Sequence, residues 1–410
     1  MSEAPIIEPI LKQVISLYSF QLPFIKEGVN FIDCFHSSCE ANETMNLVTN
    51  LTLTREKLRS SINNSLSLNE ILSSFDEYLP FLWQLLDSLD RQDPVRLDIP
   101  LRFIWKGCIS NLPECHSYNQ VIFELIMTLH SKGVLLANLA NQIVSTDPGA
   151  VNTGAKFYRE ASAILNFLSS NLIPRWQVVI DPALKPPECS SEFCKFLSDY
   201  FAACSHQLVV AKALQGSSQP PKLMTSLCLN VVRSLEFSMD FLYRNCTFDL
   251  SRTDSQLVVH IAIQREFFYS LVYYYQAEDY YSKTETGISI ALAAVAQTKL
   301  NEKPKKDKVF DPTTPGLPKS SQQTTTLRNA IIALTDKIQA IRHKSETDNR
   351  MIYFKSIPRD IADLPELPPP TSLSLPTAPY EQPVSDVIIF TFDPKRQKTV
   401  FNTIASFFSK

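Results

Sequence analysis

Helical periodicity recurs along most of this sequence and constrains its fold more than any other feature. Between Asn119 and Val144, apolar residues return every three or four positions, which places them on one face of an α-helix. Further runs of this kind are predicted at about 154–173, 191–214, 222–246, 254–282, 285–300 and 324–350. Long amphipathic helices with short connectors are typical of an α-solenoid or a bundle. Because no strict repeat of fixed length occurs, such a solenoid would be irregular.

Two short segments depart from helical spacing. In Ile99–Lys106, apolar and other residues alternate with the period of a half-buried strand, and Val387–Phe390 is a short apolar run of the same kind. We therefore predict a small sheet beside a large helical body.

Aromatic residues are concentrated in the run at 254–282. Eight of them encircle the predicted helix, which predicts a helix covered on several sides. The alternative is a regulatory phosphotyrosine or a tyrosine hydroxyl that lines a groove.

Two polar or proline-rich stretches interrupt the helical pattern. Residues 301–326 are predicted to form a solvated insertion, with lysines that contact anionic lipid as the alternative. The segment 357–383 holds eight prolines, so it must run extended, either free or along the surface.

Glycine is scarce, with 8 in 410 residues, or about 2% against a usual share of about 7%. Rossmann, P-loop and TIM-barrel enzymes need glycine at phosphate-binding turns and tight connections, so these classes are disfavoured. The sequence contains no nucleotide-binding, nucleophile-elbow or zinc-protease motif. We therefore predict a non-enzymatic protein without a cofactor, and an enzyme whose site is assembled from distant residues is the alternative.

The cysteines and the N-terminus indicate the compartment. Nine scattered cysteines and the absence of a secretory signal predict reduced thiols and a cytoplasmic location. Cys34, His36 and Cys39 could supply zinc ligands, but they lack paired spacing, so no metal is predicted. A formal charge of −3 gives no attraction to nucleic acid, and the apolar runs are too short to predict a membrane span.

Six segments occur in an order that is typical of one known family. They are Ile6–Leu11, Leu101–Lys106, Val121–Leu125, Ala155–Ser162, Gln207–Ala213 and Asn349–Pro358. Together they resemble the BRO domain (Bro-one domain) family of Alix-like and BROX-like proteins, which are associated with the endosomal sorting (ESCRT) pathway. The resemblance covers about residues 5–383.

This resemblance implies a fold, the boundaries of the domain and a location in the cell. The fold is a curved, boomerang-shaped domain, which is mainly α: a tetratricopeptide-like helical solenoid with a small β-sheet near one end. The domain would span residues 1–383, and residues 384–410 would form a C-terminal tail. The implied location is cytoplasmic, with recruitment to endosomal membranes where multivesicular bodies form.

The resemblance also implies a partner. The family binds the C-terminal amphipathic helix of an ESCRT-III subunit in a concave apolar groove, which is helix-in-groove recognition. Carried over by position, the groove residues fall on Val209, Val210, Leu223 and Leu227. The alternative is that these four side chains only pack between two helices. A scaffold for a signalling partner such as a small GTPase is the alternative function.

Two further contacts are predicted near the C-terminus. Pro376, Thr377, Ala378 and Pro379 form a P-T-A-P motif that resembles the peptides bound by the UEV domain of ESCRT-I. Basic residues followed by an apolar helical face at 395–408 could make a peripheral membrane contact. Docking of this helix on its own domain is the preferred interpretation.

Overall fold

All seven runs predicted from periodicity form helices in the computed structural model. They are α5 (Val121–Thr146), α6 (Val151–Phe167), α8 (Ser191–Gln215), α9 (Pro221–Asn245), α11 (Ser255–Ser282), α12 (Thr286–Asn301) and α13 (Ser321–Asp348). The structure describes residues 4–109, 114–176, 184–216, 219–301, 321–369, 378–393 and 395, and side chains at all of these except 4–7 and 321–324. The mainly helical fold is therefore confirmed.

Periodicity did not single out every helix. The others are α1 (Ala4–Val14), α2 (Phe31–Cys34), α3 (Asn42–Asn63), α4 (Leu68–Asp90), α7 (Ile173–Arg175) and α10 (Thr247–Leu250). The start of α4 is fixed by a capping box, in which Ser67 and Glu70 exchange side-chain-to-backbone hydrogen bonds. This device satisfies amide groups that the first turn of a helix leaves without partners.

The chain divides into two compact units. We call the first the helical unit; it comprises Met1–Ser19, Ala137–Ser162 and Phe196–Thr377. We call the second the sheet-containing unit; it comprises Phe20–Leu136, Ala163–Lys195 and Ala378–Lys410.

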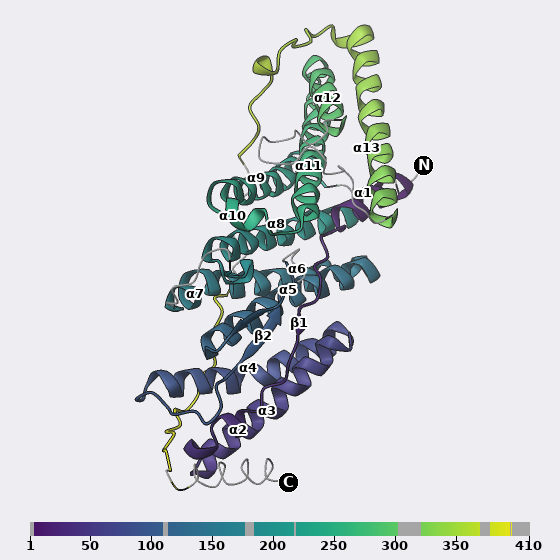
Figure 1. The fold of residues 1–410 in the computed structure, drawn as a ribbon. Coiled ribbons are helices and arrows are strands. Elements are labelled where there is room, and N and C mark those ends of the chain that lie inside the picture. Colours follow the sequence, from purple (N-terminus) through teal and green to yellow (C-terminus); the bar gives the residue numbers. More distant parts are fainter. Residues whose placement is uncertain are drawn as a thin grey trace. The chain divides into compact units, whose positions relative to one another are not determined.

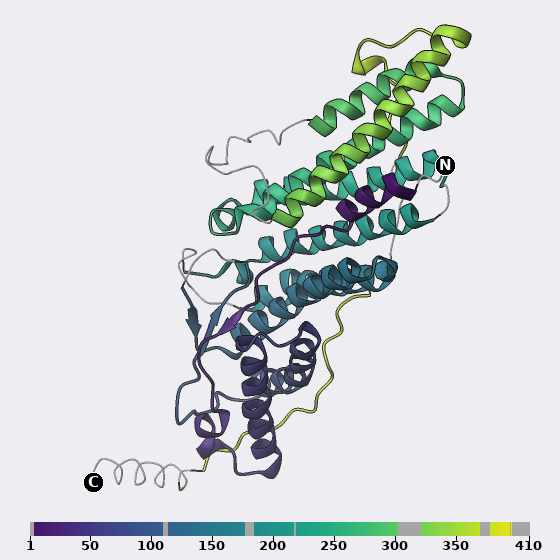
Figure 2. The ribbon, with the colours of Figure 1, turned by 90° about the vertical axis from the view of Figure 1, so that its right-hand side faces the viewer.

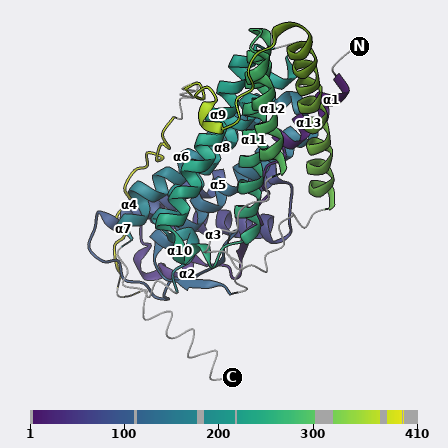
Figure 3. The same cartoon turned by 90° about the horizontal axis from the view of Figure 1, so that it is seen from above.

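In the helical unit, helices that follow one another in the chain pack side by side. α9 packs on α11, α11 on α12, and α12 on α13, and α1 lies against α13 (Figures 1 and 3). Gly154 allows α6 to approach its neighbours closely, because a Cβ there would lie 2.6 Å from Val144 and 3.0 Å from Leu208. This serial packing of helix on helix is the arrangement of a solenoid.

The aromatic helix α11 is covered on several sides, as its sequence predicts. It contacts α9, α12 and α13, and Phe267, Phe268 and Tyr274 are buried. The Gln264 side chain donates hydrogen bonds to the carbonyl oxygen of Gln13 in α1 (3.2 Å) and to that of Ser16 just after α1 (2.8 Å). Core packing therefore accounts for these three aromatic residues, and the other five of the run are partly exposed.

The sheet-containing unit holds the predicted sheet. Its three strands are β1 (Phe24–Ile25), β2 (Phe103–Lys106) and β3 (His116–Tyr118), in the antiparallel order β1-β2-β3 (Figure 2). Within β2, Phe103 and Trp105 are fully buried, but Ile104 is also buried at 3% exposed, so the strand is covered on both faces and not half-buried as the alternation in the sequence predicts. In the same unit, α3 and α4 pack against each other.

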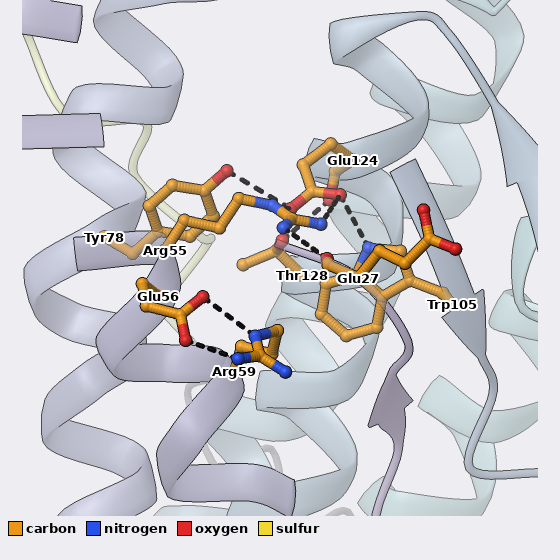
Figure 4. Close-up of polar contacts among 8 residues, drawn as sticks. All are labelled: Glu27, Arg55, Glu56, Arg59, Tyr78, Trp105, Glu124 and Thr128. Carbon is orange, nitrogen blue, oxygen red and sulfur yellow. Dashed lines mark hydrogen bonds and ion pairs between the residues drawn. The ribbon is translucent and has the colours of Figure 1, made fainter. Parts of the chain in front are cut away.

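A buried ion pair joins four elements of this unit (Figure 4). The Glu124 carboxylate on α5 accepts hydrogen bonds from Arg55 on α3 (2.8 Å), Tyr78 on α4 (3.2 Å) and Trp105 on β2 (2.6 Å). Arg55 also donates to the carbonyl oxygen of Glu27 (2.9 Å), and both charged side chains are fully buried. Burial is the largest single influence on the pKa of Arg55 and lowers it, but the charge of Glu124, the hydrogen bond to it and further contributions from Tyr78 and Glu56 together raise that pKa.

The prediction of a strand at Val387–Phe390 is wrong. The segment runs extended beside the end of α4, and its backbone bonds to a side chain of that helix and to one just beyond it instead of to a strand. The amide of Ile388 donates to Ser88 Oγ (3.0 Å), and the amide of Phe390 donates to Gln92 Oε1 (2.9 Å). The Phe390 ring is buried against Phe35.

Candidate functional site

The four residues predicted to bind a partner helix lie on α8 and α9 of the helical unit. Val210 and Leu227 are buried, with 0% and 5% of their surface exposed. Leu223 is 40% exposed, and Val209 is half-buried. The structure therefore places Val209 and Leu223 at the surface and Val210 and Leu227 beneath it.

The exposed positions of α8 and α9 recur at helical spacing. We define the α8–α9 surface by these partly or fully exposed residues: Ala202, His206, Val209 and Ala213 on α8, and Leu223, Ser226, Asn230, Ser234, Phe237 and Phe241 on α9. A hydrogen bond of 3.1 Å between His206 Nδ1 and Ser234 Oγ joins the two rows. The two rows therefore form a single surface of the helix pair.

Phe237 is a member of this surface that the sequence did not single out. Its side chain is 60% exposed, although phenylalanine usually lies in the core. It follows Leu223 by 14 positions, about four helical turns or ~21 Å along the axis. The signal was present in the sequence, because Phe237 repeats the phase of Leu223 within α9.

Some charged groups beside this surface are paired, whereas Lys212 and Lys222 next to it are exposed. Arg233 and Glu236 form an ion pair (3.1 Å), and the Tyr269 hydroxyl donates to Glu236 (2.6 Å). Burial and this bond to a carboxylate raise the pKa of Tyr269, so the tyrosine stays protonated. The surface thus presents apolar and neutral polar groups, which suit binding better than proton transfer.

The buried histidines and cysteines elsewhere in the protein lie in surroundings typical of core residues and not of a catalytic or metal site. Burial lowers the pKa of His260 to about 4 and that of His130 to about 3, so both are neutral near pH 7. All nine cysteines are free thiols, and Cys34 and Cys39 of the considered zinc cluster are buried. Among the described residues, no group of three His, Cys, Asp or Glu side chains is arranged to hold a metal ion.

One described helix, α5, is long and apolar enough to cross a membrane. However, 83% of its apolar window is buried within the protein, as in the core helix of a globular protein. The length and apolar composition of α5 are therefore only weak evidence that it crosses a membrane.

Several predicted contact elements lie partly or wholly outside the described residues. Of the P-T-A-P motif, Ala378 and Pro379 are described and exposed, whereas Pro376 and Thr377 are not described. Of the predicted insertion, 302–320 are not described and 321–326 belong to α13. Apart from Lys395, the predicted tail helix also lies outside them. Binding to ESCRT-I and a membrane contact by the tail stay predictions.

Comparison with protein-family models gives one match. Residues 24–407 match the family described as the BRO1-like domain. No curated protein sequence matches the chain.

Solved structures of similar fold point the same way. An ALIX BRO1–CHMP4C complex is similar with a TM-score of 0.68 and 14% identity, covering 87% of this chain and 94% of that one. A Bro1 domain described in terms of endosomal targeting gives a TM-score of 0.61 and 15% identity, covering 84% and 88% of the two chains. ALIX in complex with the SIVmac239 PYKEVTEDL late domain gives a TM-score of 0.69 and 14% identity, covering 95% and 53%. These similarities establish the fold.

Proposed function

Because the chain belongs to the BRO1-like domain family, whose members are protein-interaction modules, we propose that it is a non-enzymatic adaptor of the ESCRT pathway. In this proposal it acts at endosomal membranes. Its α8–α9 surface binds the C-terminal amphipathic helix of an ESCRT-III subunit.

The observation that carries the proposal is the set of apolar side chains at the surface of α8 and α9. Leu223 and Phe237 lie exposed on one side of α9 with neutral polar residues between them, and Val209 is half-buried on α8. An amphipathic helix presents apolar anchors one turn apart, so a row of this length fits several turns of it. A structural relative, the ALIX BRO1 domain, was solved with CHMP4C, an ESCRT-III subunit, which supports this class of partner.

The four residues that the sequence predicts to bind the partner helix take two roles in this proposal. Val209 and Leu223 contact the partner helix directly. Val210 and Leu227 are buried beneath them and hold the surface in place. Since valine is small, the contact at Val209 buries little area, and most of the apolar contact comes from Leu223 and Phe237.

The test is titration of the full chain with a labelled C-terminal peptide of an ESCRT-III subunit. Leu223→Asp and Phe237→Asp each place a charge where the peptide would bury an apolar side chain. We expect each to weaken binding by about tenfold or more, because burying one such side chain is worth about 1.5–3 kcal/mol. The measurement is fluorescence anisotropy.

The matched control is Leu53→Asp. Leu53 on α3 is as exposed a leucine as the protein offers, at 63%, and it lies in the sheet-containing unit. We expect unchanged affinity for this variant. If the wild type fails to bind the peptide, or Leu223→Asp binds as the wild type does, the surface is wrongly assigned. Capture of a small GTPase that Leu223→Asp abolishes would instead favour the signalling scaffold.

A further inference from the structure

A second exposed apolar cluster follows the end of α13 in the helical unit. We call residues 350–359 the tip segment; Figure 2 shows the chain turning back beyond α13. Its exposed apolar side chains are Met351, Ile352, Tyr353, Phe354 and Ile357, and Phe354 is 76% exposed. Contiguous exposed apolar groups on this scale mark an interaction site.

The tip segment is held in one conformation. It begins with a π-helical turn (Asn349–Tyr353), and the Asn349 side chain accepts from the Lys355 amide (2.8 Å) and donates to the Lys355 carbonyl oxygen (3.0 Å). Thr286 at the start of α12 donates to the same Asn349 oxygen (2.7 Å). A Cβ at Gly287 would lie 2.1 Å from the Ser356 carbonyl oxygen, so the segment packs directly on α12.

Phe354 has an unfavourable backbone conformation. Its φ of 51° and ψ of 34° lie in the left-handed region, which aromatic residues rarely occupy. Glycine would adopt this conformation without steric cost. The chain therefore keeps a strained, exposed phenylalanine where glycine would fit, and strain of this kind is concentrated at functional sites.

The charge within the tip segment is positive, and Asp348 and Asp360 border the segment. Arg350, Lys355 and Arg359 belong to the segment, and no acidic residue lies between 350 and 359. Lys355 pairs with Glu285 (3.1 Å), and Asp360 follows directly. Among the described residues, Arg350 and Arg359 form no ion pair within 4 Å, which leaves two exposed guanidinium groups beside the apolar side chains.

From this arrangement we propose that the tip segment inserts into the surface of an anionic membrane. Successive positions around one tight turn point in different directions, so the apolar side chains do not form the straight row that a partner helix requires. They form a small apolar projection flanked by cations. Such a projection fits the boundary between headgroups and acyl chains, and arginines near anionic lipid add electrostatic attraction.

The decisive variant is Phe354→Gly, because it removes the ring and also relieves the backbone strain. The assay is co-sedimentation of the full chain with phosphatidylcholine vesicles, with and without phosphatidylserine. We expect binding to the anionic vesicles, weakened by about tenfold or more in Phe354→Gly. Arg350→Glu and Arg359→Glu should each weaken it by about fivefold or more. Thermal stability of Phe354→Gly should equal or exceed that of the wild type.

The matched control is Phe237→Asp, which alters another exposed phenylalanine of the same unit. It should leave vesicle binding unchanged, whereas Phe354→Gly should leave binding to the ESCRT-III peptide unchanged. The two proposals can therefore fail separately. Wild-type affinity of Phe354→Gly for anionic vesicles, equal binding to neutral vesicles, or no vesicle binding by the wild type would each overturn the inference.

Discussion

The ion pair between Arg55 and Glu124 predicts a large effect of one small substitution. Glu124→Gln keeps the shape of the side chain but removes its charge. Arg55, which is fully buried, would then lie away from water without a counter-charge. Three donors converge on the Glu124 carboxylate, those of Arg55, Tyr78 and Trp105, and the Gln amide has only one oxygen to accept them.

Breaking a buried ion pair from one side costs about 3–5 kcal/mol. The matched control is Glu77→Gln, because Glu77 on α4 forms an ion pair (2.6 Å) at the surface with Lys57 on α3, the helix that also carries Arg55. Exposed pairs contribute about 0–1 kcal/mol. The same charge removal should therefore cost several times more at Glu124 than at Glu77.

Tryptophan fluorescence measures this difference directly. Trp83, Trp105 and Trp176 are all the tryptophans of the chain, and all lie in the sheet-containing unit, so their signal follows the unfolding of that unit. For a domain of this size, about 3–5 kcal/mol lowers Tm by about 10 °C. If Glu124→Gln shifts Tm no more than Glu77→Gln does, burial of the ion pair does not stabilise the unit as argued.

Two further substitutions test packing and protonation. Gly107→Ala should destabilise the sheet-containing unit by about 1–3 kcal/mol, because its Cβ would lie 1.8 Å from the buried Glu188 carboxylate. Tryptophan fluorescence should show a lowered Tm for this variant. A Tm equal to that of the control Gly28→Ala would contradict the predicted clash. The pKa of buried His260 is about 4, so below pH 6.5 the unfolded chain binds a proton that the folded chain does not. His260 should therefore contribute a fall of roughly 3 kcal/mol in the free energy of unfolding from pH 6.5 to 4. Urea denaturation followed by circular dichroism should show a flatter pH dependence for His260→Gln, and an unchanged slope would refute the assignment.

The sequence analysis singled out seven long helices but neither α3 nor α4. In α3 the apolar core face is interrupted, because Arg55 occupies a fully buried position between Leu51 and Leu58. The arginine is tolerated there only because Glu124, 69 positions later in the chain, supplies the opposite charge. Local periodicity contains no information about that partner, so it did not single out α3.

The segment Val387–Phe390 shows a different limit. Its apolar run resembles a strand, yet whether a strand forms depends on another strand with free hydrogen-bonding groups beside it. Here the neighbour is the end of α4, where the side chains of Ser88 in the helix and Gln92 just beyond it bond to the backbone of the segment. An extended conformation was predictable, and the hydrogen-bonding partner was not.

The candidate site was predictable to the level of the helix but not of the side chain. Adjacent residues on an α-helix point about 100° apart, so Val209 and Val210 cannot both face the same partner. Which valine is exposed depends on how α8 packs on α6 and α9, and these contacts involve residues such as Tyr158, Phe201 and Ser234. Leu223 and Leu227 are separated in the same way by the packing of α9.

The geometry of apolar exposure distinguishes the two surfaces proposed for the helical unit. On α8 and α9 the exposed side chains follow the helix axes, from Leu223 to Phe237, so a rod-shaped partner can contact several at once. On the tip segment they surround one turn centred near Phe354, so a membrane surface can cover them together whereas a single partner helix cannot. Beside the α8–α9 surface, Arg233 and Glu236 are paired with each other, whereas the tip segment has two arginines that form no ion pair among the described residues. Binding at the first surface should therefore depend mainly on apolar contact, and binding at the second should also weaken as salt screens the arginines.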